Sequence, residues 1–244
     1  MAEQGPDLSG RDVANVNLVG SRVRGLWLGH AKVTGAWLEN ASIEGDFEGL
    51  IMNGVEVAPL IEAEIERMHP VLKQIRTLQT ADDVRASVET AYGIWDALLE
   101  RASSLDEEVL HERVDDEWSF VETLRHLIYA TDGWFRHVVL DLAEPYHAIA
   151  VSHSEAYGED PGIDLDASPT FVEVLAVWRD VQAEVRAFAA AVTDAGLVHE
   201  YEPKASPGNP NGKHSLRTVF WVLGNEEYWH STYATRDLDA LAAG

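Results

Sequence analysis

Glu226 and His230 are the residues whose types and spacing most directly suggest chemistry. They belong to the stretch Asn225-Glu-Glu-Tyr-Trp-His230, within residues 215–241, whose apolar pattern predicts a long helix. At 100° per residue, both fall within about 40° of the apolar line that passes through Leu223. A carboxylate and an imidazole are costly to bury there without compensation, and side chains four residues apart can reach one point. A metal ion is the simplest compensation, so we predict a metal site.

A zinc or iron site of this kind needs a third protein ligand and an open position for water or substrate. His126, on another predicted helix, is the candidate for that third ligand. It lies about 120° from the apolar seam of its helix, which favours a histidine that faces solvent. Its own face, however, continues as Ala130 and Gly133, whose small size leaves room for a pocket. Residue spacing alone leaves both interpretations of His126 open.

Glu226 and His230 also have an interpretation without a metal. The two side chains could satisfy each other inside the core, or they could pair with Tyr233 or Arg236, which follow on the same predicted helix. Buried polar groups usually find a hydrogen-bonding partner of this kind. The spacing favours neither the metal site nor the self-satisfied pair.

Four amphipathic helices are predicted from residue 80 onwards, and they must position these side chains. Four helices of about twenty residues form a bundle, and bundles build sites from side chains on facing helices. We therefore predict that residues 80–244 form an up-down four-helix bundle. The helix starts are Thr80, Ser119 with Glu122 completing a capping box, Phe171, and the beginning of residues 215–241.

A long loop joins the second and third of these helices. It runs for about 30 residues between Leu140 and Thr170, and it contains His147, Tyr157 and several acids. Loops of this length without regular structure are uncommon unless they are functional. We expect this loop to shape substrate choice, although its composition names no substrate.

Residues 1–49 carry a different pattern, with a period of five. In blocks read from Pro6, the third position is apolar in all eight, from Leu8 to Ile43, and the blocks mostly end in Gly or Asn. This regularity resembles the pentapeptide-repeat family, which implies a short right-handed β-helix of about two coils. At roughly 4.8 Å per coil the stack is only about 10 Å tall, so the rest of the protein must cover it.

Residues 50–79 are predicted to join the two parts. An Asn53-Gly54 turn between two short extended pieces predicts a hairpin, and helical spacing over residues 58–68 stops at Pro70. The predicted fold class is therefore α+β: a short β-helix, a connecting hairpin and short helix, and a four-helix bundle.

Composition limits the partners and the compartment. The 42 acidic and 18 basic residues give a net charge of −24, which argues against binding to nucleic acid. The chain has no cysteine, so disulfides and thiolate ligands are excluded, and any thiol must come from another molecule. We find neither a secretory leader pattern nor an apolar run long enough for a bilayer. We expect a cytoplasmic protein without membrane contact, as a monomer or homodimer.

Two motifs stand out: Glu117-Trp-Ser119 with Glu122-Thr-Leu-Arg-His126, and Asn225-Glu-Glu-Tyr-Trp-His230 followed by Thr235-Arg-Asp-Leu238. They resemble the DinB/YfiT-like superfamily of metal-binding four-helix bundles, and the resemblance covers about residues 80–242. The sequence is closer to the mycothiol-dependent maleylpyruvate isomerase branch, because many other members carry histidine where this chain has Glu226. The resemblance implies that His126, Glu226 and His230 bind a divalent metal, usually zinc, with iron or nickel as alternatives.

The same resemblance implies thiol chemistry. In that branch the metal binds the sulfur of a small cellular thiol, mycothiol, and lowers its pKa so that the thiolate attacks an electrophilic substrate. We predict a metal-dependent thiol S-transferase or thiol-assisted isomerase. In this hypothesis Glu122 orients His126, Tyr233 donates a hydrogen bond to the substrate, and Arg236 binds the thiol. The alternative is a non-catalytic metal-binding or protein-interaction module.

Overall fold

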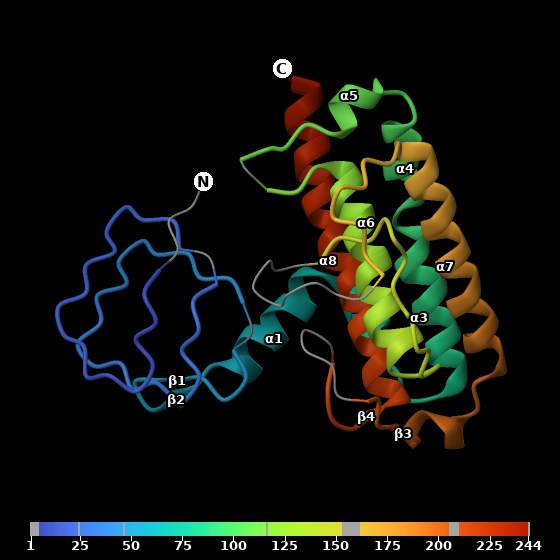
Figure 1. The fold of residues 1–244 in the computed structure, drawn as a ribbon. Helices are drawn as coiled ribbons and strands as arrows, with labels where there is room; N and C mark the ends of the chain where they lie inside the picture. Colours follow the sequence, from blue (N-terminus) through green and yellow to red (C-terminus); the bar gives the residue numbers. More distant parts are fainter. Residues whose placement is uncertain are drawn as a thin grey trace. The chain divides into compact units, whose positions relative to one another are not determined.

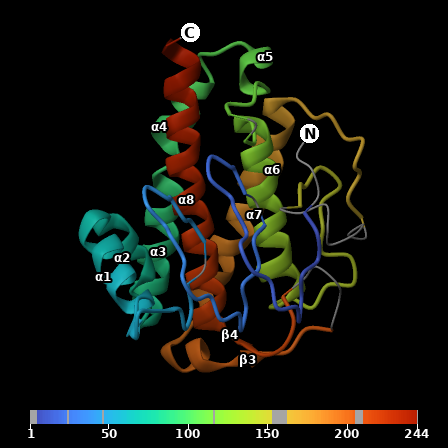
Figure 2. The ribbon, with the colours of Figure 1, turned by 90° about the vertical axis from the view of Figure 1, so that its left-hand side faces the viewer.

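The computed structural model describes residues 5–23, 25–45, 47–115, 117–152, 162–204 and 210–243. The chain divides into two compact units, residues 1–46 and residues 47–244. Long helices dominate the second unit and lie side by side (Figure 1, Figure 2). A helical bundle is therefore present where the sequence predicts one.

The backbone of the first unit repeats every five residues. Each of the eight blocks ends at a residue with a positive φ angle, as at Gly10, Asn15 and Gly20, and glycine and asparagine adopt this conformation most readily. The predicted β-helix is nevertheless not evident, because the strands in the described residues form only two small sheets, both outside this unit. The central apolar residues, from Leu8 to Ile43, stay between 41% and 62% exposed. The positions that the predicted β-helix would turn inward are therefore not buried.

The predicted hairpin is present at the start of the second unit. Strands β1 (Ile51–Met52) and β2 (Val55–Glu56) pair antiparallel around Asn53 and Gly54. Both turn residues have positive φ angles, 50° and 83°, as the two-residue turns of hairpins with this sequence require. The following helix, α1 (Ala58–Met68), also lies where the spacing predicts it.

Helix α2 (Pro70–Arg76) is a difference from the sequence-based expectation, which ends helical structure at Pro70. Proline is well accommodated at the first position of a helix, and the chain starts a new helix there. Ile75 is fully buried in a cluster with residues of α3 (Ala81–Gly93) and α8 (Leu216–Ala243). Arg76 donates from Nε to Asn225 Oδ1 at 2.8 Å. This short helix therefore braces α8 next to Glu226.

The bundle itself is built from four long helical segments. The first is broken near Trp95, and the second continues without interruption into a π-helical turn, η1. Ser119 caps the second segment and forms the predicted capping box with Glu122. The bounds are α3 (Ala81–Gly93) with α4 (Asp96–Ala102), α6 (Phe120–Thr131) with η1 (Asp132–His137), α7 (Phe171–Ala191) and α8 (Leu216–Ala243); the smaller elements are α5 (Glu107–Leu110), η3 (Asp194–Val198), β3 (Glu200–Tyr201) and β4 (His214–Ser215).

Aromatic side chains from several helices fill the bundle core. Trp95 contacts Trp178 and Phe120 edge to face, with ring centroids 5.6 Å and 6.3 Å apart, and none of the three is more than 2% exposed. A second cluster contains Phe220 and Leu223. Among the described residues, no helix has both the length and the apolar character needed to cross a bilayer.

His137, in the π-helical turn, predicts a pH dependence of stability. Its side chain is buried, and Nε2 has no hydrogen-bonding partner among the described residues. Burial lowers the pKa of His137 below its ordinary value of 6.5, and the charge of Asp141 opposes this shift. Below pH 6.5 the unfolded chain therefore binds more protons at His137 than the folded protein does. Stability should therefore fall as pH drops below 6.5. We expect His137→Leu to lose less stability than wild type between pH 6.5 and about 5 in urea unfolding; equal losses would contradict this account.

Candidate metal centre

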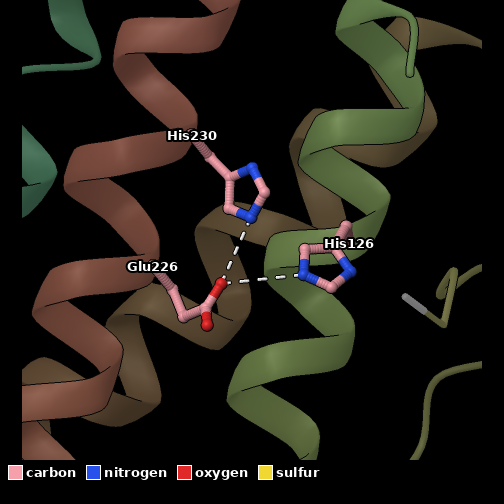
Figure 3. A group of neighbouring side chains, drawn as sticks. All are labelled: His126, Glu226 and His230. Atoms are coloured by element: carbon pink, nitrogen blue, oxygen red, sulfur yellow. Dashed lines mark ion pairs between the residues drawn. The ribbon is translucent and has the colours of Figure 1, made fainter. Parts of the chain in front are cut away.

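Helices α6 and α8 bring the three predicted metal ligands together. His126 lies on α6, while Glu226 and His230 lie one turn apart on α8 and point toward it (Figure 3). The ligand atoms of the three side chains all lie within 4.8 Å of one another. In the part of the chain that the structure describes, no other group of three or more histidine, aspartate and glutamate side chains is arranged in this way.

The distances between these atoms fit a small divalent ion. Glu226 Oε2 lies 3.2 Å from His230 Nε2 and 3.6 Å from His126 Nε2. Zinc bonds of about 2.0–2.1 Å in a tetrahedral arrangement place two ligand atoms roughly 3.3 Å apart. Two imidazole nitrogens and one carboxylate oxygen are also a ligand set of zinc sites that keep one position open. The residues present therefore fit a bound metal.

The three ligands differ in their access to solvent. The His126 side chain is 7% exposed, that of His230 is 15% exposed, and that of Glu226 is 33% exposed. The imidazole of His126 therefore forms the inner wall of the group. A small molecule that arrives from solvent would meet Glu226 and His230 first.

The electrostatics of the group favour a charged carboxylate beside a neutral imidazole. Burial opposes ionisation of Glu226, but the contacts with the His126 and His230 rings outweigh it and hold the pKa of the Glu226 carboxyl well below its ordinary value. Burial lowers the pKa of His126, although the contact with Glu226 acts in the opposite direction. A neutral imidazole is the form that binds metals.

The main-chain carbonyl of Val151 determines which ring nitrogen of His126 carries the proton. His126 Nδ1 lies 3.2 Å from this carbonyl oxygen, which can only accept a hydrogen bond. In the neutral ring Nδ1 therefore carries the proton, and Nε2 presents its lone pair to the Glu226 carboxylate. Two acceptors then face each other at 3.6 Å. A cation between them would relieve this repulsion.

The contacts of Glu122 differ from its predicted role in orienting His126. Its carboxylate accepts a hydrogen bond from the Ser119 main-chain N–H at 2.9 Å and binds the Arg113 guanidinium. The Val151 carbonyl is the acceptor that faces His126 Nδ1. The helix cap therefore accounts for Glu122, and a main-chain group takes the orienting role.

Aromatic rings surround the ligand group. The Trp118 ring lies 4.4 Å from that of His126 and 6.0 Å from that of His230. Tyr233, predicted to contact substrate, is 39% exposed and meets the His230 ring at 5.7 Å. Arg236 lies beyond it, with its guanidinium carbon 5.8 Å from the Tyr233 ring centroid and Nε donating to a neighbouring aspartate. Tyr233 therefore lies beside the ligand group, and Arg236 lies beside Tyr233.

Sequence reasoning missed Trp118 and Val151 as parts of this centre. Trp118 directly precedes Ser119, the N-cap of α6. An aromatic residue at that position packs near the first turns of the helix, so its place in the sequence could have predicted a contact with His126. The role of Val151 had no signal, since any residue has a carbonyl. In the loop between α6 and α7, His147 pairs with Asp132, while Tyr157 lies outside the described residues.

Comparison with known proteins gives one finding. A family model described as the DinB superfamily matches residues 91–234, which is well over half of the chain and includes all three ligands. No curated protein matches the chain, and no solved structure matches it.

Proposed function

The chain belongs to the DinB superfamily, and from that premise we propose that it is a metal-dependent enzyme that activates a small-molecule thiol. The reaction would be transfer of the thiol to an electrophilic small molecule, or isomerisation assisted by the thiol. Membership of the superfamily supports a metal-dependent enzyme. The thiol, the substrate and the choice of zinc over iron or nickel are parts of the proposal.

The observation that carries the proposal is the pair of facing acceptors, His126 Nε2 and Glu226 Oε2, with His230 beside them. A carboxylate that only satisfied a histidine in the core would meet an N–H donor. Here the nearest ring N–H of His126 is committed to the Val151 carbonyl. The contact between His126 and Glu226 therefore resembles a pair of metal ligands more than a self-satisfied pair.

A bound divalent ion would supply a Lewis acid that lowers the pKa of a coordinated thiol. Glu226 gives the centre a negative ligand, which keeps its net charge lower than three neutral imidazoles would and favours a reactive sulfur. Trp118 lies beside both histidine rings, and in this proposal it limits the entry of water. In this proposal Tyr233, which is exposed next to His230, donates a hydrogen bond to the bound substrate, and Arg236 binds an anionic part of the thiol.

In this proposal the thiol comes from another molecule, because the chain has no cysteine. A thiol on a separate molecule must be the nucleophile, because the chain has none of its own. A free thiol of pKa about 8.5 is only a few per cent ionised at neutral pH, so full ionisation alone gives roughly one to two orders of magnitude in rate. We propose mycothiol as the thiol, because Glu226 and its motif resemble the mycothiol-dependent maleylpyruvate isomerase branch.

The test is thiol consumption with chlorodinitrobenzene, in which a carbon–sulfur bond forms, chloride leaves and the thiol proton goes to solvent. Zinc-loaded wild type should accelerate the reaction about tenfold or more with mycothiol, bacillithiol or glutathione. His230→Ala should lose this gain. The matched control is His199→Ala, which removes an exposed histidine outside the ligand group. A rate with wild type no higher than with His230→Ala, for all three thiols, would contradict the proposal.

The alternative is that the protein is a non-catalytic metal-binding or protein-interaction module. It is favoured by the first unit, whose central apolar side chains remain about half exposed. A protein that binds one metal ion tightly but accelerates no thiol reaction would support this alternative. The two functions are therefore separated by activity and not by metal content.

A further inference from the structure

Residues 146–151, which we call the strap, follow η1 in the chain and are hydrogen-bonded to helix α6. Arg125 Nε donates a hydrogen bond to the Ile149 carbonyl at 2.6 Å, and the Val151 N–H donates to the Arg125 carbonyl at 3.3 Å. The strap thus runs antiparallel to α6. It ends at the Val151 carbonyl, which is the acceptor for His126 Nδ1.

The other end of the strap is held by the buried carboxylate of Asp132. Asp132, the first residue of η1, has no exposed surface. Its carboxylate accepts from the His147 main-chain N–H at 2.8 Å and lies 2.9 Å from His147 Nδ1. Arg136 adds a contact of 3.5 Å to the same carboxylate. A carboxylate without solvent needs such partners, so the position of His147 is tightly specified.

Stacked rings connect the strap to the ligand group between these two ends. The Tyr146 ring lies 5.2 Å from the Tyr129 ring, at an interplanar angle of 17°. Tyr129 in turn lies 5.9 Å from the His126 ring, at 29°. Both tyrosines are buried. The strap is therefore in register with α6 along its whole length, from Asp132 to His126.

We propose that Asp132 and His147 are a positioning pair for the metal centre. By fixing the register of the strap, they place the Val151 carbonyl on His126 Nδ1, which keeps the Nε2 lone pair available toward Glu226. Groups that orient a metal-binding histidine in this way commonly change metal affinity by 10- to 100-fold. The effect on metal affinity rests on the proposed function, whereas the effect on the His126 proton does not.

The first measurement uses metal-free protein and nitrogen-15 NMR of the histidine rings. Wild type should show His126 with its proton on Nδ1. His147→Ala removes the ring that holds Asp132 while leaving the main-chain N–H, and it should shift His126 toward a mixture of the two neutral forms. His147→Asn is the conservative variant, because its amide N–H can replace the Nδ1 donor, and it should restore the wild-type signature.

The second measurement is zinc affinity by competition with a chromophoric chelator. His147→Ala should bind zinc at least about tenfold more weakly than wild type, and His147→Asn should stay within about threefold. The matched control is Thr170→Ala, which removes the capping box of α7 and lowers stability without touching the strap. This control should leave both the His126 signature and the zinc affinity unchanged.

The outcomes separate the positioning role from general destabilisation. An unchanged His126 signature in His147→Ala would overturn the proposal. So would a change of equal size in Thr170→Ala, because that would assign the effect to lost stability. If wild type binds no zinc, the proposed function fails, but the NMR comparison still decides whether Asp132 and His147 position His126.

Discussion

Replacing His230 with alanine should abolish stoichiometric metal binding, and Glu226→Gln should weaken it by well over tenfold. Each change removes one of three ligands, and losing a ligand should cost more than the 10- to 100-fold that follows the loss of an orienting group. Glu226→Gln is the finer variant because it keeps the volume and removes only the charge. The measurement is metal content after dialysis, followed by competition with a chelator.

The matched control for these variants is Glu227→Gln, which makes the same change one residue away. Glu227 is buried in the bundle core, and burial raises the pKa of its carboxyl, so a neutral amide is a mild replacement there. Metal affinity should stay close to wild type in this variant. Equal losses in Glu226→Gln and Glu227→Gln would contradict the ligand assignment.

Gly224→Ala should destabilise the protein, although alanine is the better helix former by about 1 kcal/mol. A Cβ at this position of α8 would overlap the Cγ2 methyl of Ile75, which is fully buried in α2. Overpacking of this kind costs about 1–3 kcal/mol, so the clash outweighs the helix propensity. Urea unfolding of the two proteins gives the difference directly.

Gly93→Ala is the control for this effect, because a Cβ there meets no atom within 4 Å. It should be neutral or stabilising. Combining Gly224→Ala with Ile75→Leu, which removes the clashing Cγ2 methyl and keeps the side-chain volume, should recover part of the loss. A stability of Gly224→Ala equal to or above that of wild type would show that α2 does not pack on α8 in this way.

The parts of the site that follow from local rules could be predicted from the sequence. Helix starts such as Ser119 with Glu122 depend on neighbours within one turn, and so does the alignment of Glu226 with His230 on one face. His126 could not be settled in this way. It lies off the apolar seam of its own helix, and its burial depends on Trp118, the strap and α8, which are remote in sequence.

Other differences have the same origin in tertiary contacts. Pro70 is a helix stop by local rules, yet the chain starts α2 there because Ile75 finds a buried place against α8. The π-helical turn begins at Asp132, whose partner His147 comes from the following loop. In the first unit the five-residue period is present in the backbone, but the described residues show no β-helix, and the central apolar residues stay between 41% and 62% exposed.

The most direct test of the central claim is a cobalt titration of metal-free protein, followed by addition of a thiol. Cobalt(II) replaces zinc in sites of this kind and reports its ligands by absorption. We predict saturation at one cobalt per chain, and then a new sulfur-to-cobalt charge-transfer band when mycothiol or glutathione is added, both lost in His230→Ala. If cobalt does not saturate at one per chain, or if His230→Ala takes up cobalt as wild type does, then His126, Glu226 and His230 are not the metal ligands.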